Sequence, residues 1–209
     1  KMAAIAQAGF NTVMWYNAGQ LDLAHQYGLK MLNQVKPPNL IADFHREHPA
    51  NWGYYVGDEP PVSEYPAMAA EVNFIHETDP NHPAYVNITG KSEIAPFLAA
   101  VDPKVLSYTG TYKWWWYNTP YYESMETSRT AGLAAGIPVM RWIEVNANPD
   151  VETAQLNNPD VPAWSITVPP PPDNAEKLRQ SVYSSLAYGV KAIQWFTGAI
   201  LFEYGTSQL

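Results

Sequence analysis

Short runs of β-branched and aromatic residues alternate along this chain with stretches in which apolar residues recur every three or four positions. Residues 65–78 show the helical spacing clearly, because Met68, Val72 and Ile75 fall on one face. Apolar runs bounded by glycine and proline are typical of buried strands. The pattern therefore predicts seven strands, each followed or preceded by a helix, at residues 9–16, 29–35, 53–59, 84–88, 104–110, 137–144 and 190–196.

Strands that alternate with helices favour βα units and a parallel sheet. We predict an α/β fold, a (β/α)₈ TIM barrel that forms one domain over residues 1–209. The seven strands are interpreted as strands two to eight, with strand one expected before Lys1 and the last helix after Leu209. The alternative is a doubly wound open sheet, which calls for a glycine-rich phosphate turn after a strand. The sequence has no such turn.

Charge and composition narrow the class of ligand. A net charge of −8 argues against nucleic acid as a partner, and no apolar run approaches the roughly 18 residues of a membrane span. The chain has no cysteine, so disulfide and thiolate chemistry are excluded. Eight Trp and fourteen Tyr suit an uncharged, hydroxyl-covered ligand. We expect a carbohydrate partner and no cofactor, in a protein that is secreted or periplasmic with its signal upstream; the oligomeric state has no sequence signature.

In a TIM barrel, residues at the carboxyl ends of the strands face the active site. Glu59 and Glu144 end two strands on opposing walls, so their carboxyl groups are expected to face each other. Glycoside hydrolysis uses such a pair. A single glutamate at a strand end also serves as a simple loop-capping acceptor, and the pairing favours catalysis. The other predicted site residues, all substrate-binding, are Trp15, Asp58, Asn87, Tyr108, Tyr112, Trp115, Trp116 and Trp195.

A metal-dependent hydrolase is the rival enzyme class. It would place His or Asp at several strand ends. The five histidines fall instead on predicted helices and turns. No metal site is therefore predicted.

The two glutamates also lie in recognisable surroundings. Asp58-Glu59-Pro60, after an aromatic strand, resembles the Asn-Glu-Pro motif that carries the acid/base of clan A glycoside hydrolases on strand four. Glu144 is similar in placement to the nucleophile of that clan on strand seven, and Trp195 to its strand-eight tryptophan. The segment from Tyr108 to Tyr112 resembles its tyrosine-bearing end of strand six. The resemblance implies that Glu59 is the acid/base and Glu144 the nucleophile.

Two departures mark a divergent member of that clan. Asp58 stands where the clan has an asparagine that contacts the sugar 2-hydroxyl, and an ionised Asp accepts hydrogen bonds but does not donate them. The strand-two arginine of the clan has no counterpart near Trp15.

Two further segments extend the expected site. Residues 114–117, Trp-Trp-Trp-Tyr, follow strand six, and neighbouring indoles of a regular element point in different directions. At least one is expected to be exposed as a sugar platform; a hydrophobic wedge or interdomain contact is the alternative. The proline-rich segment 145–173 is interpreted as an active-site wall or a stiff surface loop.

The sequence as a whole predicts a retaining glycosidase acting on β-linked oligo- or polysaccharide. Glu59 is expected to have a raised pKa, and Arg141 or a tyrosine hydroxyl is expected to keep Glu144 ionised. The alternative is a non-catalytic carbohydrate-binding barrel on the same scaffold.

Overall fold

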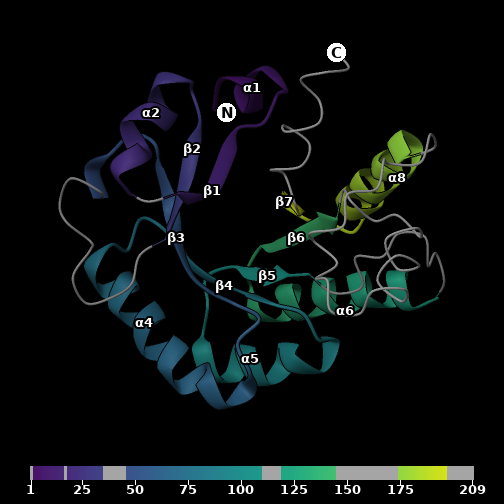
Figure 1. Cartoon of the computed structure of the whole chain (residues 1–209). Coiled ribbons are helices and arrows are strands. Elements are labelled where there is room, and N and C mark those ends of the chain that lie inside the picture. Colours follow the sequence, from purple (N-terminus) through teal and green to yellow (C-terminus); the bar gives the residue numbers. More distant parts are fainter. Residues whose placement is uncertain (1, 17, 35–45, 110–118, 145–173, 197–209) are drawn as a thin grey trace, which may run out of the picture.

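Seven parallel strands follow one another in sequence order across a single curled sheet (Figure 1). The computed structural model describes residues 2–16, 18–34, 46–109, 119–144 and 174–196. The strands are β1 (Thr12–Tyr16), β2 (Lys30–Gln34), β3 (Asn51–Asp58), β4 (Ala84–Ile88), β5 (Leu106–Tyr108), β6 (Val139–Glu144) and β7 (Ala192–Phe196). All six neighbouring pairs are parallel. The predicted α/β class and incomplete (β/α)₈ barrel are confirmed.

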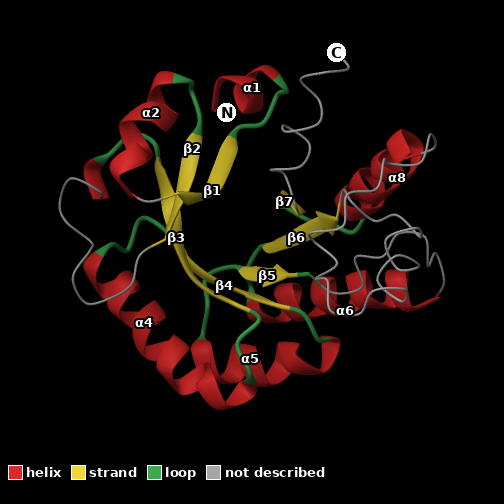
Figure 2. Ribbon diagram, in the orientation of Figure 1, coloured by secondary structure: helices red, strands yellow, loops and turns green. Residues whose placement is uncertain are grey.

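Helices cover the outer, convex side of the sheet (Figure 2). They are α1 (Met2–Gln7), α2 (Leu21–Gln26), α4 (Tyr65–Thr78), α5 (Ile94–Val101), α6 (Thr119–Ala135) and α8 (Asn174–Ala187), with 3₁₀ turns at Ala18–Gln20, Val62–Glu64 and Lys91–Glu93. A helix predicted at residues 40–48 lies mostly outside the described residues. No helix in the described ranges is long and apolar enough to cross a membrane.

The side chains of each strand alternate between two apolar layers. On the outer side, Tyr54, Val86 and Tyr108 join α4 and α5 residues such as Val72 and Phe97 in the largest cluster. On the inner side, Leu32, Tyr55, Tyr85, Val105 and Met140 form a second cluster, with Met14 and Ala192 packed against it. Strand alternation therefore decides which residues can reach the concave side of the barrel.

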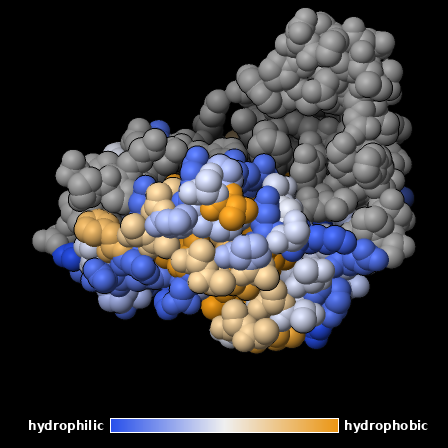
Figure 3. Space-filling model, turned by 90° about the horizontal axis from the view of Figure 1, so that it is seen from below, coloured by the Kyte–Doolittle hydropathy of each residue, from blue (hydrophilic) through white to orange (hydrophobic). Residues whose placement is uncertain are grey.

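The surface over the helices is mixed in character. In the view from below, on the side of α4 and α5, hydrophobic residues lie among hydrophilic ones (Figure 3). Such mixing is ordinary for a solvent-facing helical layer. In a barrel of this kind the active site lies at the carboxyl ends of the strands, away from this helical layer.

Candidate active site

The Asp58-Glu59 pair stands where β3 leaves the sheet. Tyr54 packs in the outer cluster and Tyr55 in the inner one, and the register with β4 shifts between Tyr55 and Gly57. After this bulge Asp58 pairs with Asn87 of β4. Pro60 and Pro61 then prevent the strand from continuing. Both carboxyl groups are brought to one edge, which we call the carboxyl edge: the ends of β3, β4, β5 and β6.

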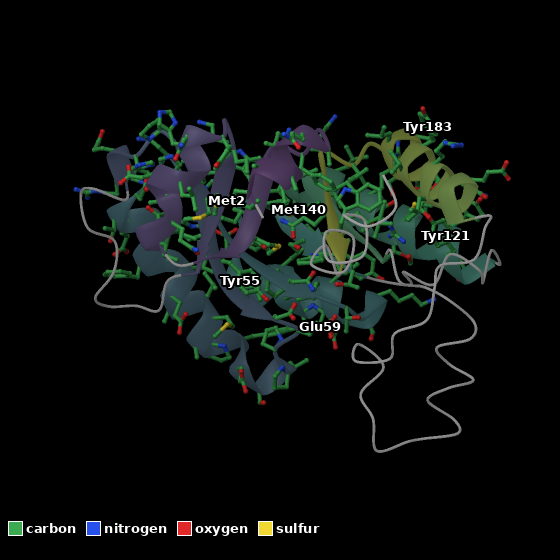
Figure 4. All side chains as sticks on the ribbon, turned by 45° about the horizontal axis from the view of Figure 1, so that its top comes forward. Met2, Tyr55, Glu59, Tyr121, Met140 and Tyr183 are labelled. Atoms are coloured by element: carbon green, nitrogen blue, oxygen red, sulfur yellow. The ribbon has the colours of Figure 1, made fainter. Side chains whose placement is uncertain are left out.

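Glu59 has a left-handed backbone, with φ of 46°. Only one other described non-glycine residue, Asp102, has a positive φ. A side chain in this region is strained, and such strain gathers at functional sites. The backbone N–H of Glu59 still donates to the carbonyl oxygen of Asn87 over 2.8 Å, so the conformation is held by the ladder between β3 and β4. Figure 4 shows Glu59 beyond the strand end, with Tyr55 and Met140 within the curve of the sheet.

The surroundings of Glu59 favour its protonated form. Partial burial raises the pKa of the Glu59 carboxyl above its usual value, and the negative charge of Asp58 raises it further. Hydrogen bonds from the hydroxyl groups of Thr89 and Thr109 oppose this shift, and the charge of Glu93 adds to it. The net direction is the one expected for a general acid that works near neutral pH.

A buried polar network lies beneath the pair. Asn87 Nδ2 donates to Asp58 Oδ1 over 2.9 Å and to Thr109 Oγ1 over 2.7 Å. Ser107 Oγ donates to Asn87 Oδ1 over 3.2 Å, and Trp142 Nε1 donates to Ser107 Oγ over 3.1 Å. Ser107, Thr109 and Trp142 were not among the predicted site residues. Ser107 lies two residues after Val105, and Trp142 two residues after Met140. Because residues two apart on a strand share a face, this spacing is the sequence signal that could have identified both.

Glu144 is the last residue of β6 and pairs in register with Phe196 of β7. Met140, Trp142 and Glu144 follow one another at intervals of two residues along β6, so their positions share one face of the strand. Because β3 and β6 are parallel members of one sheet, their carboxyl ends lie at the same edge. The predicted arrangement of Glu59 and Glu144 at one edge of the barrel agrees with the backbone.

Three predicted residues have other surroundings than expected. Tyr108 is buried in the outer core, beside Ser124 of α6, so its prediction as a substrate-binding residue is wrong. Trp195 lies on the same face of β7 as Ile193, which packs on the outer cluster, and on the opposite face from Ala192, which packs on the inner one. The centres of the Trp195 and Phe10 rings are 6.2 Å apart. Asn87 is on the inner side but buried, so it reaches the carboxyl edge only through its hydrogen bonds.

Arg141 of β6 packs against α6. Its guanidinium lies 5.1 Å from the centre of the Tyr121 ring of α6 and is almost fully buried. Tyr108 is its register partner on β5 and interacts with its charge. Arg141 therefore belongs to the outer layer, which argues against the expectation that it holds Glu144 ionised.

The remaining predicted residues are only partly placed. Trp15 belongs to β1. Tyr112, Trp115 and Trp116, together with the proline-rich segment 145–173, lie outside the described residues. Within the residues that are described, no group of three or more His, Cys, Asp or Glu side chains could hold a metal ion.

Comparison with known proteins bears on the fold. No protein-family model matches the chain, and a search of curated proteins finds no match. Among solved structures, it is similar to the crystal structure of a Bacteroides thetaiotaomicron protein described as "a putative alpha-L-fucosidase", with a TM-score of 0.52 and 10% sequence identity. The match covers 84% of this chain and 62% of the other. At this identity the likeness shows the fold alone.

Proposed function

We propose that this protein is a glycoside hydrolase that cleaves β-linked oligo- or polysaccharide with retention of configuration. Glu59 is the acid/base and Glu144 the nucleophile. The observation that carries the proposal is the pairing of a strained Glu59 of raised pKa with a second glutamate, three strands away, at the same edge of a curled parallel sheet. Two carboxyl groups facing each other across a sugar are what the reaction needs.

The two steps assign distinct work to each group. Protonated Glu59 donates its proton to the oxygen of the departing sugar while the Glu144 carboxylate attacks the anomeric carbon. Glu59, now ionised, removes a proton from water, whose oxygen attacks that carbon and releases Glu144. Retention calls for carboxyl groups about 5–5.5 Å apart, whereas inversion calls for about 6.5–9.5 Å.

The test is hydrolysis of a panel of aryl glycosides and β-linked glycans. Because the similar solved structure is described as a fucosidase, an aryl α-L-fucoside belongs in the panel. Glu144→Ala should abolish turnover, and azide should restore it while forming a glycosyl azide of inverted configuration. In Glu59→Ala, azide should give the retained azide from an activated substrate. Saturable glycan binding that survives Glu144→Ala, with no product from any member, would instead identify a non-catalytic carbohydrate-binding barrel.

The aromatic segment 114–117 is proposed as a sugar platform on the same edge, with Trp115 and Trp116 as the stacking rings. Replacing an exposed ring with Ala should raise KM on long substrates more than on short aryl glycosides, because stacking away from the scissile bond is shared by ground and transition states. A core ring would instead cost about 3–5 kcal/mol of stability and leave KM unchanged.

A further inference from the structure

The polar network beneath the carboxyl pair has a direction. An indole N–H can only donate, so Ser107 Oγ must accept from Trp142 Nε1. The single hydrogen of Ser107 is then free to donate to Asn87 Oδ1. With its oxygen occupied in this way, Asn87 turns both of its N–H groups toward Asp58 and Thr109.

The network divides at Asn87 into two branches. One N–H of Asn87 donates directly to Asp58 Oδ1. The other donates to Thr109 Oγ1, which leaves the hydroxyl hydrogen of Thr109 available to an acceptor at the carboxyl edge. Every donor on the path from Trp142 to Asp58 and Thr109 thus points the same way.

We propose that Asn87 is a positioning residue: Ser107 and Trp142 orient its amide, and the amide fixes Asp58, the residue next to Glu59, and sets the direction of the Thr109 hydroxyl. Its catalytic consequence rests on the function proposed above, whereas the orientation itself can be measured without turnover.

The reversed amide is disfavoured by three separate losses. It would place Asn87 Oδ1 against the carboxylate of Asp58, leave Thr109 without its donor, and leave the Ser107 hydrogen without an acceptor in Asn87. Asn87, Ser107 and Trp142 are each at most 3% exposed, so water cannot replace the missing bonds. The amide therefore has one stable orientation, set from inside the barrel.

Asp58 gains a defined role from this arrangement. Oδ1 of Asp58 accepts the hydrogen bond from Asn87, whereas Oδ2 accepts none from the described part of the chain. The Asp58 residue is exposed. Asp58 thus presents a fixed acceptor beside Glu59.

The decisive experiment follows the side-chain amide of Asn87 by ¹⁵N–¹H NMR, with Asn87→Leu to assign its two resonances. Ser107→Ala removes the hydroxyl alone and should accelerate exchange of the Asn87 amide hydrogens at least tenfold. Ser107→Thr restores a hydroxyl and should return the wild-type spectrum. Trp142→Phe, which removes the first donor together with part of the buried ring, should move the same resonances in the same direction. Asp58→Asn should shift them as well, because it changes their direct partner.

Ser185→Ala is the matched control. Ser185 is as fully buried as Ser107 and donates to the Ser181 carbonyl oxygen on α8, outside the network. It should leave the Asn87 resonances unchanged at a comparable loss of melting temperature. Wild-type exchange in Ser107→Ala, or equal acceleration in Ser185→Ala, would overturn the proposal. If Ser107→Thr does not fold, the contrast between Trp142→Phe and Ser185→Ala decides.

Kinetics separates this inference from the proposed function. On a substrate found with the panel, Ser107→Ala should lower kcat at least tenfold with KM little changed, because small displacements of a catalytic carboxyl are costly. Unchanged kcat with altered NMR would show that the orientation of Asn87 does not affect turnover, and would leave the glycosidase proposal standing. If no panel member is cleaved, the glycosidase proposal fails while the NMR contrast still decides the orientation.

Discussion

The backbone N–H of Glu59 donates to the carbonyl oxygen of Asn87 over 2.8 Å while Glu59 itself has φ of 46°. The ladder between β3 and β4 therefore holds a non-glycine residue in the left-handed region. For L-residues this conformation costs roughly 1–2 kcal/mol.

Glycine at this position should stabilise the protein. Glu59→Gly removes the strain, and after the extra unfolded-state entropy of glycine we expect a net gain of about 0.5–1 kcal/mol. Glu59→Ala keeps the strained Cβ and should lack this gain. Urea unfolding of both variants measures the difference. Activity should be lost in both, which would make Glu59 a residue retained at the expense of stability.

Asp102 offers the matched control, because it has φ of 48° at the end of α5 and donates its N–H to Leu98. Asp102→Gly should give a similar gain and leave turnover intact. An unchanged or lower stability in Glu59→Gly, beside a gain in Asp102→Gly, would show that Glu59 is unstrained.

Stability should also depend on pH through Glu59. Its folded-state pKa is raised, so between the ordinary value of 4.5 and the raised value the folded state binds more protons than the unfolded chain. Stability contributed by this group therefore falls as pH rises, and the ionised carboxyl is destabilising above the raised pKa. Glu59→Gln should gain melting temperature relative to wild type as pH rises above the ordinary value of 4.5, and the gain should level off once the raised pKa is passed.

Asp58→Asn tests the cause of that dependence. Burial is the larger cause of the raised pKa and the Asp58 charge the second, so this variant should reduce the pH-dependent difference without removing it. A difference between Glu59→Gln and wild type that shrinks with rising pH would contradict the assignment.

Hydrophobic periodicity was enough to predict all seven strands and the fold, because βα alternation leaves few other topologies. It was not enough to decide which strand-end residue faces inward. On β5 the inward residue is Ser107 and the outward one Tyr108, a difference of one position that reverses the face. The bulge after Tyr55, which turns Asp58 toward Asn87, depends on pairing with β4 and leaves no local signal.

A second buried network, near the amino-terminal ends of the strands, should contribute to stability alone. Tyr54 donates its hydroxyl to Asp79 Oδ2 over 2.6 Å and accepts from Asn51 Nδ2 over 3.1 Å. Asp79 also bonds His82 Nδ1 over 2.8 Å. Tyr54→Phe would leave a buried carboxylate oxygen of Asp79 and an N–H of Asn51 without this hydrogen-bond partner. We therefore expect the free energy of unfolding in urea to fall by about 1–3 kcal/mol.

Tyr65→Phe is the control for Tyr54. Tyr65 is buried in the same outer cluster, and its hydroxyl has no hydrogen-bond partner among the residues that the structure describes. Its removal should change stability by less than about 0.5 kcal/mol. Equal losses in the two variants would mean that the hydrogen-bonded hydroxyl of Tyr54 contributes no more to stability than the hydroxyl of Tyr65.

Arg141 provides the last prediction, because its buried charge lies against the ring of Tyr121 in the outer layer. Burial lowers the pKa of the guanidinium, while Tyr121 and Tyr108 favour its charged form. Tyr121 hydrogen-bonds Arg141 and also Ser184 on α8 at 3.1 Å, so Arg141 connects β6 to two helices.

Arg141→Met keeps most of the volume and removes the cost of burying a charge. It should be neutral or stabilising by about 1–2 kcal/mol in urea unfolding. Arg141→Ala leaves a cavity and should cost about 3–5 kcal/mol. If Met were as damaging as Ala, the guanidinium contacts would outweigh its desolvation. Because Arg141 lies on the outer layer, Arg141→Met should leave the pH profile of turnover unchanged, whereas an arginine partner of Glu144 would shift its acidic limb.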